Sequence, residues 1–227
     1  MLSLIKIKNR MKILNLYACL GGNRYKWNEV AKEAGIEIEV TAIEWDEELA
    51  KLYQERFPND TVIVSDAHQY LLDHYKEFDF IWSSPPCPTH SRARFARRNT
   101  TVPTYPNMKL YQEIIFLDKW FKGKYIVENV IPYYEPLISA QKKGRHLYWT
   151  NFNLPNNLNE RKASIMEGKN EVANWSEFHQ YDFTKYKGKQ RTDKIARNLV
   201  DYEAGRTILE TVLGIVKKSN IKQTELF

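Results

Sequence analysis

Two reactive side chains, a thiol and a carboxylate, stand directly after apolar segments of this 227-residue chain. Cys87 follows an apolar run that ends in two serines and two prolines, and Glu128 follows a second apolar run at 125–127. A deprotonated cysteine is a strong nucleophile, although a lone cysteine in a proline turn is more often structural. A carboxylate and an amide, Glu128 and Asn129, are costly to bury without partners. Their presence at a second strand end favours a catalytic thiol.

Strands must carry these side chains to one place, and the apolar pattern predicts strands along the chain. We expect strands over residues 13–18, 38–43, 61–64, 78–82, 125–127 and 144–150, and helices over 24–34, 47–57, 108–121 and 204–216. Strands that alternate with helices indicate the α/β class with a mainly parallel sheet. Because such sheets bind ligands at the carboxyl ends of their strands, Cys87 and Glu128 are expected at one edge.

The first strand runs into a glycine turn of the kind that allows a ligand to approach the backbone. Gly21 and Gly22 form this turn, and Glu44 ends the second strand about 20 residues later, where ribose-binding acidic residues stand. Trp45 is placed to lie against an adenine ring, and the neighbouring Asp46 favours a helix cap. Asp66, after the third strand, suits either an adenine amino group or the cap of the next helix.

A basic segment follows Cys87. No acidic residue occurs from residue 80 to residue 112, whereas Arg92, Arg94, Arg97 and Arg98 lie within this stretch. A long basic loop beside a thiol suits phosphate contacts with a nucleic acid, and a merely solvated basic loop is the alternative. The formal net charge of +6 also hints at a polyanionic partner.

Composition excludes several other classes of protein. A hydrophobic content of 43% and a charged content of 27% are typical of a soluble globular domain. Two cysteines cannot build a disulfide framework, and the histidines show no zinc-ligand spacing with them, so we expect a reducing compartment and no metal. No apolar run is long enough for a membrane span, and the first ten residues lack a signal-peptide core. We therefore expect a cytoplasmic protein whose start is either Met1 or Met11.

Taken in order, these motifs resemble those of the DNA (cytosine-5) methyltransferase family over most of the chain. The matching segments are Tyr17-Ala18-Cys19-Leu20-Gly21-Gly22, Glu44-Trp45, Asp66, Pro85-Pro86-Cys87, Glu128-Asn129-Val130 and Arg197-Asn198-Leu199-Val200. Pro-Pro-Cys and Glu-Asn-Val are each weak signals alone. Together they are specific, because they stand 41 residues apart and both follow a cofactor signature.

The resemblance implies a Rossmann-like methyltransferase fold that uses S-adenosylmethionine. Its catalytic domain is expected over 1–150 and 191–227, with a short, irregular target-recognition region over 151–190. The implied cofactor contacts are Tyr17, Ala18, Cys19, Gly21, Gly22, Glu44, Trp45, Asp66, Pro86 and Asn198. The implied catalytic residues are Cys87, Glu128, Asn129 and Arg145, with Arg92, Arg94, Arg97 and Arg98 on DNA. The implied partner is double-stranded DNA, bound by a monomer without a metal in a bacterial or phage-infected cell.

The chain departs from the family pattern at several positions. Tyr17 stands where phenylalanine is usual, and Cys19 and Arg197 stand where glycine is usual. In the arginine motif only Arg145 remains, with His146 as a candidate for a second basic position.

Three alternatives to a DNA methyltransferase follow from the same residues. One is an RNA (tRNA) cytosine-5 methyltransferase, and another is a catalytically inactive regulatory or DNA-binding protein. A Rossmann-like dehydrogenase is disfavoured, because the first turn lacks the Gly-x-Gly-x-x-Gly spacing.

Overall fold

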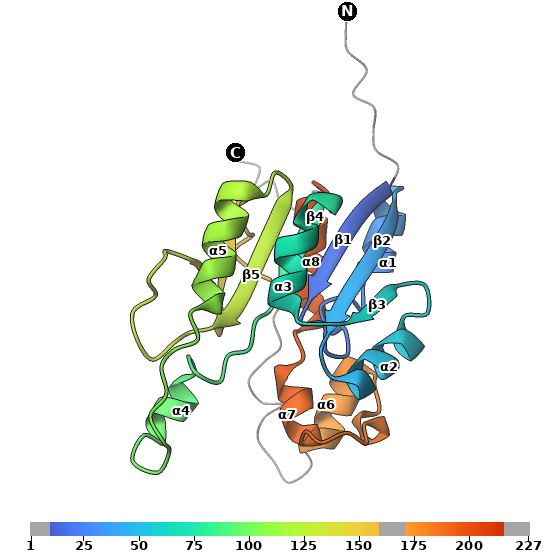
Figure 1. The fold of residues 1–227 in the computed structure, drawn as a ribbon. Coiled ribbons are helices and arrows are strands. Elements are labelled where there is room, and N and C mark those ends of the chain that lie inside the picture. The colour runs from blue at the N-terminus through green and yellow to red at the C-terminus, as the bar shows by residue number, and fades with distance from the viewer. Residues whose placement is uncertain (1–9, 159–170, 216–227) are drawn as a thin grey trace, which may run out of the picture.

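A seven-stranded sheet forms the centre of the computed structural model, which describes residues 10–158 and 171–215 (Figure 1). The strand order is β3-β2-β1-β4-β5-β7-β6. The strands are β1 (Arg10–Leu16), β2 (Glu37–Glu44), β3 (Thr61–Val64), β4 (Phe80–Ser83), β5 (Lys124–Val130), β6 (Gln141–Lys143) and β7 (His146–Thr150). The first five strands run parallel to one another, whereas β7 runs antiparallel to both β5 and β6.

Helices cover both faces of this sheet. They are α1 (Trp27–Ala34), α2 (Glu47–Arg56), α3 (Ala67–His74), α4 (Arg92–Ala96), α5 (Lys109–Trp120), α6 (Glu171–His179), α7 (Thr192–Asn198) and α8 (Tyr202–Val212), with short 3₁₀ turns η1 (Tyr75–Glu77) and η3 (Phe183–Lys185). Alternate strand residues face opposite layers, as the pleat requires. Leu14 and Ile81 pack with α3 and α5, whereas Ile13 and Trp82 pack with α1 and α8.

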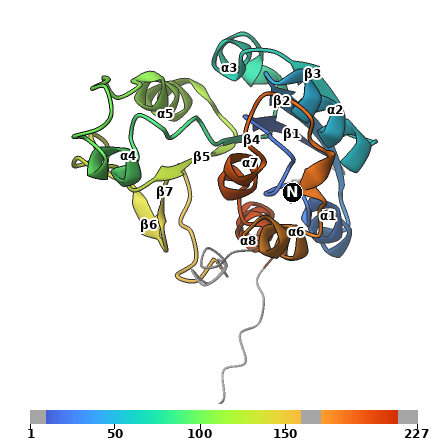
Figure 2. The same cartoon turned by 90° about the horizontal axis from the view of Figure 1, so that it is seen from below.

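The register aligns the carboxyl ends of the central strands. Leu16 pairs with Ser83, and Ser83 pairs with Val127, so the residues that follow emerge at one edge. This edge faces downward in Figure 1, and α7 lies below it in that view and beside the end of β4 in Figure 2. The mainly parallel α/β fold predicted from the sequence is confirmed.

The predicted end of the fifth strand is wrong, because β5 continues through Val130. Its partner β7 pairs Tyr148 with Glu128 and His146 with Val130, which extends β5 beyond the end of its parallel neighbour β4. Glu128 and Asn129 therefore lie inside a strand, on the part of β5 that projects past the sheet edge. The backbone on which they stand is held by ladder hydrogen bonds.

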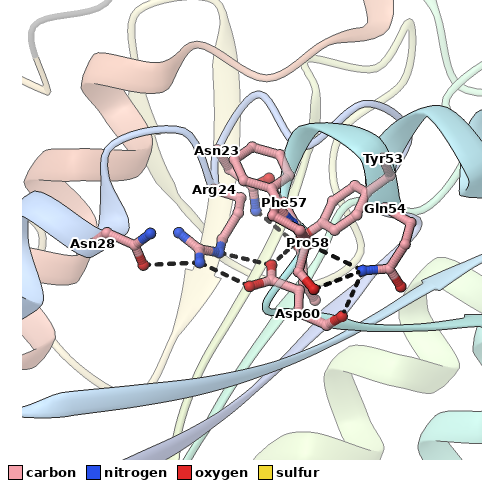
Figure 3. Close-up of polar contacts among 9 residues, drawn as sticks. Asn23, Arg24, Asn28, Tyr53, Gln54, Phe57, Pro58 and Asp60 are labelled. Carbon is pink, nitrogen blue, oxygen red and sulfur yellow. Dashed lines mark hydrogen bonds and ion pairs between the residues drawn. The ribbon is translucent and has the colours of Figure 1, made fainter.

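The first helix begins at Trp27 rather than at Arg24, because the preceding residues form turns. The Arg24 guanidinium instead points inward and makes a bidentate pair with the carboxylate of Asp60, with both N–O distances 2.8 Å (Figure 3). Tyr53 donates to the same carboxylate at 2.9 Å, and Gln54 Nε2 donates to the carbonyl of Asp60. This buried network joins the turn after β1 to the loop after α2.

Three other predicted details differ from the structure. Ile115 is 54% exposed rather than part of the buried face of α5, because that face consists of Leu110, Tyr111, Ile114 and Leu117. Strand β6 was not predicted, since its three residues are polar. The last helix, α8, ends at Val212, and Val216 lies outside the described residues, as do Met1 and residues 159–170.

The region predicted as irregular contains α6 and packs tightly on the sheet-bearing part of the chain. Trp175, Phe183 and Tyr186 are buried against Leu20 and Ile195. The division into a catalytic domain and a target-recognition region stays a prediction.

Two expected absences concern membranes and metals. Within residues 10–158 and 171–215, no helix has the length and apolar character needed to cross a membrane. The same residues contain no cluster of three histidine, cysteine or acidic side chains arranged to hold a metal ion.

Candidate active site

A pocket lies at the carboxyl edge of the sheet, between the ends of β1, β2 and β3 and the start of α5. We call it the cofactor pocket; its lining residues are Tyr17, Ile43, Trp45, Ser65, Asp66, Ala67, Pro85, Pro86, Asn107, Lys109 and Leu110. Four of the predicted cofactor contacts, namely Tyr17, Trp45, Asp66 and Pro86, are among them. Ile43, Lys109 and Leu110 were not predicted as pocket residues, because nothing in the sequence indicates which side of a strand or helix faces a ligand.

Glu44 sits between the two backbone turns that border this pocket. Its Oε2 accepts from the backbone N–H of Cys19 at 2.8 Å, and its Oε1 accepts from those of Trp45 and Asp46 at 3.0 Å. Burial raises the pKa of this carboxyl, and the backbone donors oppose that effect. Because Oε2 has a single donor, it can accept a further bond from a ribose hydroxyl.

Asp66 performs the capping role and also faces the pocket. Its Oδ1 accepts from the backbone N–H of Gln69 at 3.1 Å, which caps α3, while Oδ2 lies 3.4 Å from the ammonium of Lys109. The backbone bond to Gln69 holds the pKa of this carboxyl below its usual range, with Lys109 adding to the effect. An ionised carboxylate at this position suits the amino group of an adenine ring.

The glycine turn after β1 packs closely against the segment between α7 and α8. A Cβ on Gly22 would lie 2.1 Å from the carbonyl oxygen of Val200, so only glycine allows this approach. Ala18 and Cys19 are close to Ile43 and Glu44 through backbone bonds, and burial raises the pKa of the Cys19 thiol. Asn198 ends α7 with an exposed side chain and is not among the residues lining the pocket.

These residues fit S-adenosylmethionine on their chemistry. Apolar surfaces of Ile43, Trp45 and Leu110 suit an adenine ring, and the carboxylates of Asp66 and Glu44 suit its amino group and the ribose hydroxyls. The pocket ends at Pro85 and Pro86, directly before Cys87.

Cys87 and Glu128 interact electrostatically at this edge. Burial raises the pKa of the Cys87 thiol, the Glu128 carboxylate raises it further, and the ammonium of Lys194 lowers it. Lys194 was not predicted as a site residue. It stands on α7 four residues before Asn198, in a segment rich in lysine and arginine that spans residues 185–197. Its electrostatic effect on a cysteine more than one hundred residues earlier could be found only from the fold.

Asn129 fastens the cysteine loop, residues 84–87, to β5. Its Nδ2 donates to the carbonyl oxygen of Pro85 at 2.9 Å, and its Oδ1 accepts from the backbone N–H of Val130 at 2.9 Å. Asn129 is 3% exposed, so both bonds are protected from water. The orienting role of Asn129 stays a prediction.

The two basic candidates of the arginine motif lie at the β6–β7 turn. His146 Nε2 stands 3.5 Å from Glu128 Oε1, and Arg145 precedes it on the exposed turn. His146 thus contacts the carboxylate of Glu128.

The arginine loop, residues 88–107, folds back on itself and on residues 131–134. Thr89 Oγ1 accepts from the backbone N–H of Asn107 at 2.9 Å, which joins the two ends of the loop. Arg92 Nε donates to the carbonyl of Pro132, and Arg94 donates to that of Val102. Arg98 lies over the ring of Phe95, and the side chain of Arg97 is exposed. Each guanidinium retains donors for an anion, because it carries five.

The sheet order, the pocket at the carboxyl edge and the acidic residue at the end of β2 define a Rossmann-like, S-adenosylmethionine-dependent methyltransferase. The family model for C-5 cytosine-specific DNA methylases matches residues 11–133, more than half of the chain, and the chain belongs to this family. Its cofactor is S-adenosylmethionine, and its reaction class is methylation of cytosine at C5 within a nucleic acid.

A solved structure shares this fold at low sequence identity. The Entamoeba histolytica methyltransferase EhMeth is 10% identical, with a TM-score of 0.54 over 92% of this chain and 99% of that chain. A Spodoptera frugiperda DNMT2 variant is 15% identical, with a TM-score of 0.47 over 90% of this chain and 99% of that chain. No curated protein sequence matches the chain.

Proposed function

We propose that this protein methylates C5 of cytosine in double-stranded DNA, with Cys87 as the nucleophile. The observation that carries the proposal is the joint placement of Cys87, Glu128 and Asn129. The thiol and the carboxylate interact, and the amide of Asn129 holds the cysteine loop at Pro85 O. A protein that only bound DNA would need none of these three residues beside a cofactor pocket.

The chemistry follows from the weakness of C5 as a nucleophile. The Cys87 thiolate adds to C6, and the electrons of the C5–C6 double bond move onto C5 and the ring. Glu128 donates a carboxyl proton to N3, which offsets the negative charge that develops there, and accepts a hydrogen bond from the exocyclic amine. S-adenosylmethionine bound in the cofactor pocket would supply an electrophilic methyl group and would leave as the thioether S-adenosylhomocysteine. C5 takes up this methyl group, a base removes the C5 proton, and the returning electrons restore the double bond and expel the Cys87 thiolate.

The protonation of Cys87 limits this sequence at its first step. Burial and Glu128 both raise the pKa of the thiol, whereas a backbone hydrogen bond and the cation of Lys194 lower it and so favour the thiolate. Arg145 is a second candidate for that role, at the exposed β6–β7 turn.

Access to the target atom requires that cytosine leave the base stack, since C5 and C6 are covered in a duplex. The arginine loop directly follows Cys87 and offers Arg92, Arg94, Arg97 and Arg98 for the phosphates around the flipped nucleotide. The proposal includes action as a monomer in the cytoplasm of a bacterial or phage-infected cell.

Parallel assays test the substrate. Transfer of a labelled methyl group is measured on duplex DNA and on tRNA, and bisulfite sequencing of DNA from expressing cells reports the methylated positions. We expect label on duplex DNA at a defined sequence. Transfer to tRNA without transfer to DNA would reject the DNA assignment in favour of an RNA enzyme, and transfer to neither would favour an inactive homologue.

A further inference from the structure

A buried carboxylate that plays no part in the chemistry above lies beneath the cofactor pocket. The Glu113 side chain, on α5, is fully enclosed, and three side chains from three different segments converge on it. Tyr17 donates its hydroxyl to Oε1 at 2.6 Å, and Ser83 donates its hydroxyl to Oε2 at 2.6 Å. The ring of His68 contacts Oε1 through Nδ1 at 2.9 Å.

Each of these three side chains lies in or next to the cofactor pocket or the strand before Cys87. Tyr17 itself lines the cofactor pocket. Ser83 ends β4, four residues before Cys87. His68 lies in the first turn of α3, next to Ala67, which also lines the pocket. One carboxylate therefore binds the ends of the neighbouring strands β1 and β4 and the beginning of α3.

The helix that carries Glu113 also borders the pocket. Leu110 is part of the lining, and Lys109 reaches Asp66 at 3.4 Å. A shift of α5 would thus move several pocket residues together, and the three bonds to Glu113 oppose such a shift.

The backbone conformation of Tyr17 is unusual, so a bond that fixes its side chain has an added importance. Its backbone has a φ of 57°, in the left-handed region that a residue with a bulky side chain rarely adopts. The hydroxyl bond to Glu113 fixes the ring while the backbone holds this conformation. Burial and the Glu113 carboxylate both raise the pKa of Tyr17, so its hydroxyl keeps the proton that it donates.

We propose that Glu113 is a positioning residue that holds Tyr17 against the methyl donor and, through Ser83, aligns the strand that leads to Cys87. This role rests on the cofactor pocket being the binding site for S-adenosylmethionine. Phenylalanine at position 17 would keep the ring and lose the link, so the hydroxyl can be tested separately from the pocket surface.

Calorimetric titration of S-adenosylmethionine into the protein without nucleic acid tests the effect of the Tyr17 hydroxyl on cofactor binding. Tyr17→Phe is expected to raise Kd about fivefold, because part of the free energy of the lost hydrogen bond to Glu113 appears in cofactor binding. Tyr125→Phe is the matched control, because its hydroxyl bonds Asp118 at 3.3 Å on the same helix, outside the pocket. Its Kd is expected to stay within about twofold of the parent.

Double substitution and turnover test whether the effect passes through Glu113. If it does, Tyr17→Phe combined with Glu113→Leu binds no more weakly than Glu113→Leu alone, because Glu113→Leu already removes the acceptor of the Tyr17 hydroxyl. Ser83→Ala is expected to lower kcat at saturating cofactor while leaving Kd unchanged. Unchanged binding by Tyr17→Phe, or additive losses in the double variant, would overturn this role. Cofactor binding is measured without nucleic acid, so its result does not depend on the methylated substrate. Methylation of RNA instead of DNA would overturn the proposed function alone and would leave the role of Glu113 intact.

Discussion

The side-chain amide of Asn129 donates to the main-chain carbonyl of Pro85 across 2.9 Å, joining strand β5 to the cysteine loop. Asn129 stands next to Glu128 in β5, and Pro85 stands two residues before Cys87. The hydrogen bond from Asn129 to Pro85 therefore constrains the distance between Cys87 and Glu128, although neither Cys87 nor Glu128 forms it. Because the backbone of β5 is held by β7 at this point, the constraint has a rigid base.

Loss of this bond should impair turnover more than cofactor binding. Asn129→Ala is expected to lower kcat about tenfold or more, because small misplacements of a nucleophile are costly to the rate. The Kd for S-adenosylmethionine should change less than about twofold. Asn151→Ala is the matched control, since Asn151 also makes two backbone bonds, to Tyr125 N and Gly123 O, away from the cysteine loop. Equal kcat losses in both variants would count against a specific role for Asn129.

Removal of the cation near Cys87 should shift the pH dependence of the reaction. Lys194 lowers the pKa of the thiol, so Lys194→Met raises that pKa and leaves less thiolate at any given pH. The rising limb of the pH–rate profile should move to higher pH, with a rate about threefold lower near neutrality and little difference at high pH. The rate at which iodoacetamide alkylates Cys87 should also fall near neutrality, because less of the thiol is ionised there. Lys187→Met, an exposed lysine of the same basic segment, serves as the control. An unchanged profile in Lys194→Met would exclude Lys194 from this role.

The buried pair of Arg24 and Asp60 should dominate stability near the glycine turn. Both side chains are 3% exposed, so Asp60→Asn leaves a buried guanidinium without its counter-charge. We expect a loss of about 3–5 kcal/mol in the free energy of unfolding, measured by denaturant titration. Glu39→Gln breaks the exposed pair with Arg10 and should cost less than about 1 kcal/mol. Similar losses in the two variants would contradict the inferred importance of burial.

Close packing at Gly22 should make that position intolerant of any side chain. Gly22→Ala places a Cβ against the carbonyl oxygen of Val200, so the glycine turn and the segment before α8 must separate. We expect a lower melting temperature and S-adenosylmethionine binding weakened about tenfold or more. Gly35→Ala has open space around it and a φ of +67°, so it should cost only about 1 kcal/mol of stability and leave binding intact. Normal binding by Gly22→Ala would show that this contact is dispensable.

Residues near each other in the sequence account for the part of the site that could be predicted. Apolar runs mark the strands, and the side chains that follow them, such as Cys87, Glu44 and Asp66, must emerge at the edge where parallel strands end. Their types then indicate the chemistry. The limits of β5 were missed because they depend on β7, which pairs with it from a distant part of the chain.

Contacts between distant segments account for what could not be predicted. Lys194 acts electrostatically on a cysteine that lies far away in the sequence, and only the packing of α7 beneath the sheet edge (Figure 1) reveals this effect. Glu113 stands in a helix without any motif, and its burial depends on three partners from other elements. In the same way, Asp46 both caps α2 and accepts from Tyr186 and Gln190, which ties the turn after β2 to the end of the predicted recognition region.

Trapping of a covalent complex tests the central claim most directly. Duplex DNA that carries 5-fluorocytosine at the recognised position is incubated with the protein and S-adenosylmethionine, and the products are separated by denaturing electrophoresis and mass spectrometry. Fluorine cannot leave C5 as the proton does, so elimination stops and the Cys87–C6 bond persists. The account predicts a stable protein–DNA complex with the modified peptide containing Cys87, and no complex with Cys87→Ala. Methylation of unmodified DNA by Cys87→Ala, or a complex attached at another residue, would contradict it.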